Sequence, residues 1–216
     1  MATTTKKQAA QPTKSVAGAS KRAVVSGTSR DQAATNGKTS TKPTARATGK
    51  TDTYTVPGLS KSEAKTVITA LQDRLVALID MTLTLKHVHW NVVGNGFIGV
   101  HEMLDPHYEA VALMVDATAE RIATLGGSPN GLAGSLVKNR SWDDYALGRA
   151  VVPQHLQALD SAYSGVVTDH RKAVKTVGAI DPVTEDMLIG QLAALEQFQW
   201  FVRAHLENGD GVIFQN

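Results

Sequence analysis

The sequence predicts an all-α protein built as a four-helix bundle. Apolar residues recur at helical spacing in four long stretches, and segments rich in glycine or proline separate those stretches. No stretch shows a convincing strand pattern, and 216 residues are enough for one sizeable domain. A long connection in the middle of the chain would allow the second and third helices to run parallel.

The first two predicted helices have clear boundaries. The first begins at Ser60, which forms a capping box with Glu63, and it ends at a Gly-Asn-Gly turn over residues 94–96. The second helix covers about residues 98–125, and a Gly-Gly-Ser-Pro segment stops it. These two helices carry the polar residues considered below.

The remaining helices follow the long connection. The third is expected over about residues 153–177. The fourth is expected over about residues 182–207, after the N-cap Asp181. The connection over 128–150 is loop-like, and a short helix capped at Ser141 is expected within it.

The charge of the chain is divided between a basic arm and an acidic body. Residues 1–50 contain ten Lys or Arg, a single acid (Asp31), and no Leu, Ile, Phe, Tyr or Trp. Such a segment cannot bury enough apolar surface to fold, so we expect it to be disordered. The prediction has three parts: a disordered basic arm over 1–53, the bundle over 54–207, and a short tail over 208–216.

Composition also excludes several classes of protein. The chain has no cysteine, so it has neither a disulfide framework nor a thiolate metal site. It has no apolar run of about 20 residues that would cross a membrane, and no apolar secretory signal at its start. We therefore expect a soluble, cytoplasmic protein without membrane partners.

Four polar residues lie on one face of the second predicted helix. His101 and Asp105 are four residues apart, as are Asp116 and Glu120, so each pair shares a face. Asp105 and Asp116 are separated by eleven residues, which is about three full turns plus 20°. All four side chains therefore form one stripe along the helix.

The length of this stripe divides it into two half-sites. Asp105 and Asp116 are about 16 Å apart along the axis, whereas a metal–ligand bond is about 2 Å long. An isologous dimer with antiparallel second helices would place the His101 end of one subunit against the Glu120 end of the other. His89, near the end of the first helix, is placed to complete the first half-site.

Two imidazoles and three carboxylates favour iron or manganese over a soft ion. Several alternatives remain. Each acid is also explained as an ordinary surface residue. A zinc hydrolase that uses His101, Glu102 and Asp105 is a second alternative, although it leaves Asp116 and Glu120 without a role. A di-iron site within one chain needs Glu-x-x-His on two helices, and the sequence contains no such motif.

The same motifs resemble those of a known family. The segments His89-Trp90-Asn91, Val100-His101-Glu102-Met103-Leu104-Asp105 and Ala119-Glu120-Arg121 are similar to the signature of Dps, the DNA-binding proteins from starved cells. The similarity extends over about residues 55–207. It implies a ferritin-like four-helix subunit that assembles into a hollow dodecamer.

The resemblance also implies an activity and a ligand set. Dps proteins oxidise Fe(II), often with hydrogen peroxide, at di-iron ferroxidase centres between two-fold-related subunits, and they store the ferric product. The family's ligands fall on His89, His101 and Asp105 of one subunit and on Asp116 and Glu120 of its partner. Acids at the start of the last helix line iron-entry pores in the family. Here they are Asp181 and Asp186, while Gly190 stands where some relatives have a further acid.

The basic arm predicts a second function. Cations spread along a flexible chain contact phosphates without reading bases, so we expect non-specific DNA binding and association with the nucleoid. Alternatives are a solvated tail that keeps an acidic cage soluble, and a non-enzymatic nucleoid-compacting protein. The cations of the arm are Lys6, Lys7, Lys14, Lys21, Arg22, Arg30, Lys38, Lys42, Arg46 and Lys50.

Overall fold

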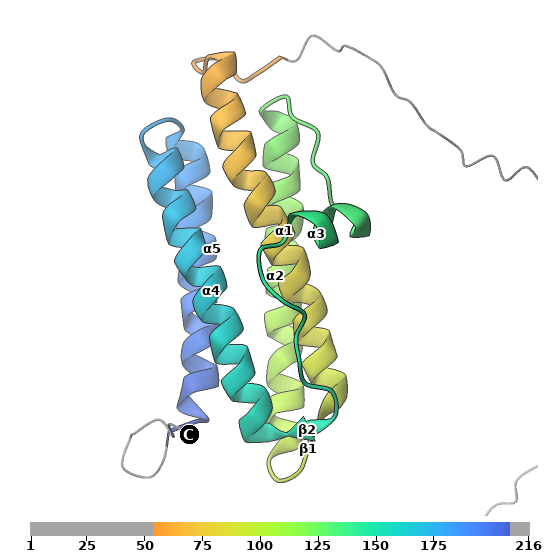
Figure 1. Cartoon of the computed structure of the whole chain (residues 1–216). Helices are drawn as coiled ribbons and strands as arrows, with labels where there is room; N and C mark the ends of the chain where they lie inside the picture. Colours follow the sequence, from red (N-terminus) through yellow and green to blue (C-terminus); the bar gives the residue numbers. More distant parts are fainter. Residues whose placement is uncertain (1–53, 208–216) are drawn as a thin grey trace, which may run out of the picture. The chain divides into compact units, whose positions relative to one another are not determined.

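A computed structural model of the chain describes residues 54–207, and the predicted arm and tail lie outside this range. Four long helices form a bundle (Figure 1), which confirms the all-α prediction. The predicted boundaries of the four long helices agree with the structure to within about three residues. The long helices are α1 (Lys61–Asn91), α2 (Phe97–Thr124), α4 (Val152–Gly178) and α5 (Pro182–Ala204).

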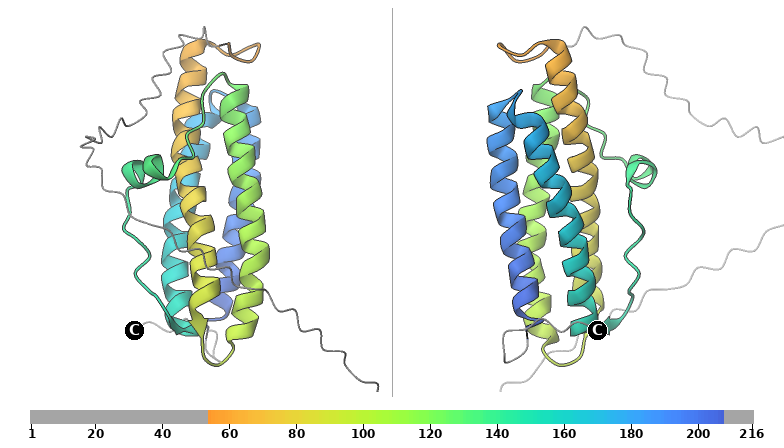
Figure 2. Two further views of the ribbon diagram at one scale, coloured as in Figure 1. Left: turned by 90° about the vertical axis from the view of Figure 1, so that its right-hand side faces the viewer. Right: turned by 60° about the vertical axis from the view of Figure 1, so that its left-hand side comes forward.

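The middle connection returns the chain from one end of the bundle to the other (Figures 1 and 2). Helices α1 and α2 are antiparallel neighbours, as are α4 and α5. Because α4 begins at the end where α2 also begins, α2 and α4 run parallel, as the length of the connection predicted.

Helix α1 begins with the predicted capping box. The Glu63 amide donates to Ser60 Oγ at 3.2 Å, and the Ser60 amide donates to Glu63 Oε2 at 2.8 Å. Two amides that would otherwise lack partners are thereby satisfied at the first turn.

The core of the bundle consists mainly of Leu and Val side chains from all four long helices. One cluster surrounds Leu85, Leu104 and Tyr163, and a second surrounds Leu71 and Leu188 towards the opposite end. Burial of these side chains supplies the main driving force for helix association. None of the helices within residues 54–207 is both long and apolar enough to cross a membrane.

Helix α2 continues through Pro106 without ending. A proline inside a helix lacks an amide hydrogen, so the Glu102 carbonyl loses its bond from the residue four positions on. Glu102 is exposed, which allows water to satisfy that carbonyl. His101 and Asp105, just before the proline, therefore remain on the same continuous helix as Asp116 and Glu120.

A short helix lies in the middle connection, but the predicted start at Ser141 is wrong. Helix α3 covers Ala133–Asn139 instead, and the buried Leu136 anchors it. The residues after it are held by long-range contacts, because Trp142 Nε1 donates to Asp80 Oδ2 at 2.5 Å and Arg140 pairs with the same carboxylate at 3.2 Å. Neighbouring Asp144 also pairs with Arg140. The polar groups of residues 140–144 thus attach the middle connection to α1 and do not cap a helix.

Two short strands were missed by the sequence prediction. Strand β1 (Val92–Val93) follows α1 and pairs in parallel with β2 (Ala150–Val151), which precedes α4. Each strand has two residues, too few for a period-two pattern to appear in the sequence. The pairing ties the end of α1 to the start of α4.

Candidate metal centre

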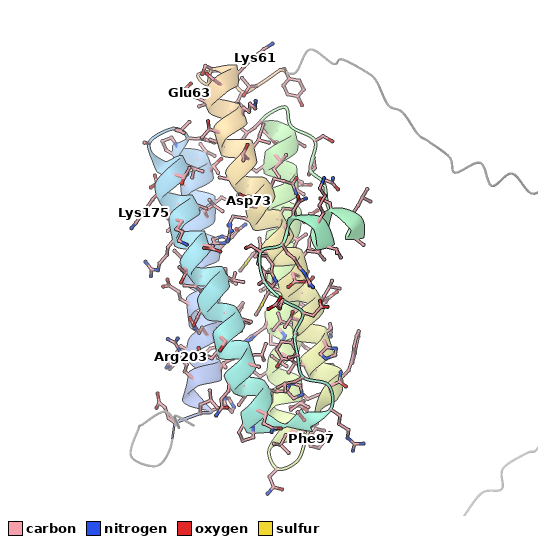
Figure 3. The ribbon with its side chains drawn as sticks, viewed as in Figure 1. Lys61, Glu63, Asp73, Phe97, Lys175 and Arg203 are labelled. Atoms are coloured by element: carbon pink, nitrogen blue, oxygen red, sulfur yellow. The ribbon has the colours of Figure 1, made fainter. Side chains whose placement is uncertain are left out.

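His89 and His101 meet at the end of the bundle where α1 passes into α2. His89 lies in the last turn of α1 and His101 near the start of α2, which Phe97 marks in Figure 3. The two imidazole rings are stacked, with centroids 3.6 Å apart and planes inclined by 23°. The structure therefore brings together two predicted ligands that are twelve residues apart in the sequence.

Reciprocal hydrogen bonds fix the protonation of both rings. His89 Nδ1 donates to the His101 carbonyl at 2.9 Å, and His101 Nδ1 donates to the His89 carbonyl at 2.9 Å. Because a carbonyl oxygen only accepts, each neutral ring must carry its hydrogen on Nδ1. The lone pair is then on Nε2, the arrangement that a metal-ligating histidine requires.

Asp105 lies beside this pair and has a cationic partner. Its Oδ1 is 2.6 Å from Lys86 Nζ and 3.3 Å from His89 Nδ1. The hydrogen bond from Lys86 lowers the pKa of Asp105, so its carboxyl group stays ionised to lower pH. Lys86 Nζ also lies 4.7 Å from the centre of the Tyr108 ring. The three residues of the first predicted half-site, His89, His101 and Asp105, thus lie together beside a positive charge.

Sequence reasoning missed Lys86. A signal was present, because Lys86 precedes His89 by three residues and so shares its face of α1. The nearby His87, which we did not predict as a ligand, instead places Nε2 2.7 Å from the Leu147 carbonyl in the middle connection.

Asp116 and Glu120, the residues of the second predicted half-site, lie further along α2. Both side chains are exposed, and within residues 54–207 neither carboxylate has a hydrogen-bonding or ionic partner. Over the same residues, no group of three or more His, Asp or Glu side chains is placed to hold a metal ion. In one chain, His89, His101 and Asp105 are thus not placed to hold a metal ion by themselves, and the two halves of the stripe stay apart.

The two predicted pore residues differ in their surroundings. Asp186 is exposed on α5, whereas Asp181 is buried at its start. Burial would raise the pKa of Asp181, but hydrogen bonds from Thr184 and Arg121 outweigh it and hold this pKa below its usual range. Arg121 Nη2 donates to Asp181 Oδ2 at 2.6 Å, linking α2 to α5. In this chain the Asp181 carboxylate is thus already neutralised by a partner.

Comparison with known proteins places the chain in a family. Residues 68–212 match the family described as ferritin-like domain. The DNA protection during starvation protein of Mycolicibacterium smegmatis is 53% identical over 158 residues, 73% of this chain and 86% of the relative. The fine tangled pili major subunit of Haemophilus ducreyi is 49% identical over 160 residues, 74% of this chain and 85% of the relative.

A solved structure gives the same result. DpsA14 from Streptomyces coelicolor superposes with a TM-score of 0.74 at 58% identity, covering 75% of this chain and 96% of that one. The sequence similarity and the arrangement of the helices agree. The chain belongs to the Dps family and has its ferritin-like fold.

Proposed function

We propose that this protein is a ferroxidase that oxidises Fe(II) and stores the ferric product inside a homo-oligomeric, dodecameric cage. One observation carries the proposal: His89 and His101 hold each other in the tautomer that leaves both Nε2 atoms free for a metal. The ionised Asp105 adds an oxygen ligand beside them. Imidazole and carboxylate together suit Fe(II) and still better the harder Fe(III), so this ligand set favours oxidation.

The proposed site is completed across a two-fold axis. Asp116 and Glu120 have carboxylates without partners in the described part of the chain, and they lie on the same stripe of α2 as His101. Large apolar side chains are also exposed on the two helices that carry the ligands: Trp90 on α1 is 72% exposed and Leu113 on α2 is 71% exposed. Exposed apolar groups of this size favour burial in an interface. An isologous dimer would cover them and build two sites.

The chemistry needs two metal ions near one oxidant. Two Fe(II) ions supply the two electrons that break the O–O bond of one hydrogen peroxide molecule, and the oxygen atoms leave as water or hydroxide. Oxygen as oxidant takes four electrons to reach water, so it needs two such pairs. Five ligands from two subunits leave positions on the metal ions for the oxidant, as an active rather than structural site requires.

Stopped-flow absorbance tests the activity. Fe(II) added anaerobically and followed by peroxide should produce rapid ferric absorbance in the wild-type cage. The triple variant His101→Ala, Asp105→Ala, Glu120→Ala should slow this phase at least about 100-fold, because it removes ligands from both halves. Glu102→Gln is the matched control, since Glu102 lies exposed on α2 next to His101. An unchanged rate in the triple variant would refute the proposal.

We further propose that residues 1–53 bind DNA without sequence preference. Ten Lys or Arg and one acid in residues 1–50 support this, as does the name of the M. smegmatis relative, which refers to DNA protection. Deleting residues 1–50 should abolish a DNA mobility shift, and the shift of the full chain should weaken steeply as salt rises.

Native mass and helix content of the deleted variant provide the control for this test. Persistent DNA binding by an intact cage without residues 1–50 would contradict the assignment. A DNA shift without any iron oxidation would instead identify a non-enzymatic nucleoid-compacting protein.

A further inference from the structure

A cavity of about 690 Å³ lies between α1 and α4. Asn139, Ser141 and Trp142 of the middle connection form part of its wall. The bond from Trp142 to Asp80 fixes that wall to α1. The remaining lining includes Thr66, Thr69 and Thr176, whose hydroxyls each donate to a backbone carbonyl four residues earlier.

Arg74 is the buried charge of this cavity. The residue is only 8% exposed, and within residues 54–207 its guanidinium group makes no hydrogen bond that meets normal geometry. Its nearest carboxylate oxygen, Asp169 Oδ2, is 3.9 Å from Nη2, and its Nη1 is buried without a partner. A guanidinium group has five N–H donors, and here they have one distant carboxylate oxygen and no hydrogen bond, so the group can still bind an external acceptor.

Two carboxylates near Arg74, those of Asp169 and Asp73, compensate its charge only in part. Asp169 is engaged by Lys172, whose Nζ lies 2.8 Å from the other carboxylate oxygen. Asp73, which Figure 3 labels on α1, lies at the rim of the cavity and is exposed. His170 is buried and neutral: burial, the main cause, and the nearby Arg74 charge together lower its pKa to about 4.

We propose that this cavity binds inorganic phosphate or a small phosphomonoester, with Arg74 as the principal contact. The planar guanidinium fork matches two oxygens of a phosphate group. Lys172 and the hydroxyl of Ser141 line the same space and can donate to the remaining oxygens. Two carboxylates in the lining restrict the class of anion that fits. Asp73 and Asp169 are acceptors, so they favour an oxyanion that still carries a hydroxyl.

Hydrogen phosphate and phosphomonoesters keep such a hydroxyl near neutral pH, at least in part, whereas sulfate and the phosphodiesters of DNA do not. The site should therefore prefer phosphate to sulfate. It is independent of the iron-oxidising site, because it shares no residue with the ligand stripe.

Isothermal titration of the full-length, iron-free cage with sodium phosphate at constant ionic strength tests the proposal. Wild type should bind phosphate saturably, and sulfate at least about tenfold more weakly. Arg74→Gln should weaken phosphate binding at least about tenfold, because it removes a charge-assisted contact. Arg171→Gln is the matched control, since Arg171 lies on α4, is exposed, pairs with Glu196 and does not line the cavity.

Phosphate binding in Arg74→Gln equal to that of wild type would overturn the proposal, as would the absence of saturable binding in wild type. If Arg74→Gln does not assemble, a wild-type crystal soaked in arsenate decides the question. Arsenate is tetrahedral and keeps a hydroxyl near neutral pH. An anomalous peak beside Arg74 supports the site, and a soaked crystal without that peak refutes it.

Discussion

His107 and His170 are fully buried among the helices, in contrast to His89 and His101 at the end of the bundle. His107 Nδ1 lies 3.1 Å from the Tyr163 hydroxyl, and His170 Nε2 lies 3.0 Å from Gln191 Oε1. Burial lowers the pKa of both to about 4, from an ordinary value of 6.5. The same side chain thus serves as a neutral core residue in one place and as a metal-ligand candidate in another.

These two histidines make the fold sensitive to acid. Between pH 6.5 and about 4 the unfolded chain binds protons at these positions while the folded chain does not, so stability falls as pH falls through that range. Each histidine lowers the free energy of unfolding by up to about 2 kcal/mol between pH 6.5 and pH 5.

Replacing His170 tests this linkage. His170→Gln should lower the melting temperature at pH 7.5, because the new side chain fits the buried position less well, but the further fall from pH 7.5 to pH 5 should be smaller than in wild type. Calorimetry of the iron-free cage at both pH values measures the difference. His205→Gln is the control, since His205 is exposed. An equal pH dependence in wild type and His170→Gln would contradict the assigned role.

At the scale of the elements, the N-terminal segment of the bundle passes over the end of α2. Gly126 adopts a positive φ of +86°, and a Cβ built on it would lie 1.7 Å from the Tyr54 carbonyl oxygen. Both conditions require glycine, since a side chain would be strained by φ and would collide with backbone. Gly126 therefore ends α2 and admits the segment that leads into α1.

Substitution of Gly126 should affect this junction more than any exposed glycine. Gly126→Ala should destabilise the bundle by at least about 1–2 kcal/mol, through positive φ and the clash with Tyr54. Hydrogen exchange should show faster exchange in the first turn of α1. Gly134→Ala is the matched control: Gly134 lies in α3 with open space around its Cα, so alanine should be neutral or slightly stabilising. Equal stability of the two variants would contradict this account.

The sequence predicted the long helices well because each carries its own boundary signals. Ser60 and Glu63 mark the start of α1, and Pro182 marks the start of α5. The middle connection was predicted less well because long-range contacts decide its structure. Trp142 and Arg140 bind Asp80, some 60 residues earlier, and no local pattern reveals that pairing.

The candidate site was likewise predicted where local spacing decides it and missed where long-range contacts decide it. Helical spacing alone placed His101, Asp105, Asp116 and Glu120 on one stripe, and α2 is continuous over all four. Spacing did not reveal the mutual hydrogen bonds of His89 and His101, because they depend on how α1 and α2 meet. Nor did it reveal the buried Arg74, since a lone arginine in an amphipathic helix resembles an ordinary surface residue.

At the scale of the whole molecule, the central claim is that the active unit is an interface between subunits. In the proposed site, each chain would supply one histidine-rich half-site and one carboxylate half-site, and the two are separated along α2. A dimer with two-fold symmetry joins unlike halves, so it has two equivalent sites. Variants that each lack one half should therefore restore activity to each other, which a site within one chain does not permit.

Co-assembly of two inactive variants measures this most directly. One variant carries His101→Ala and Asp105→Ala, and the other carries Asp116→Ala and Glu120→Ala. In mixed dimers one site lacks both halves and the other is fully wild type, so cages refolded from an equal mixture should recover about a quarter of the wild-type ferroxidase rate. Each variant refolded alone should stay inactive. Mixed cages of confirmed composition that remain as inactive as their parents would contradict the shared site.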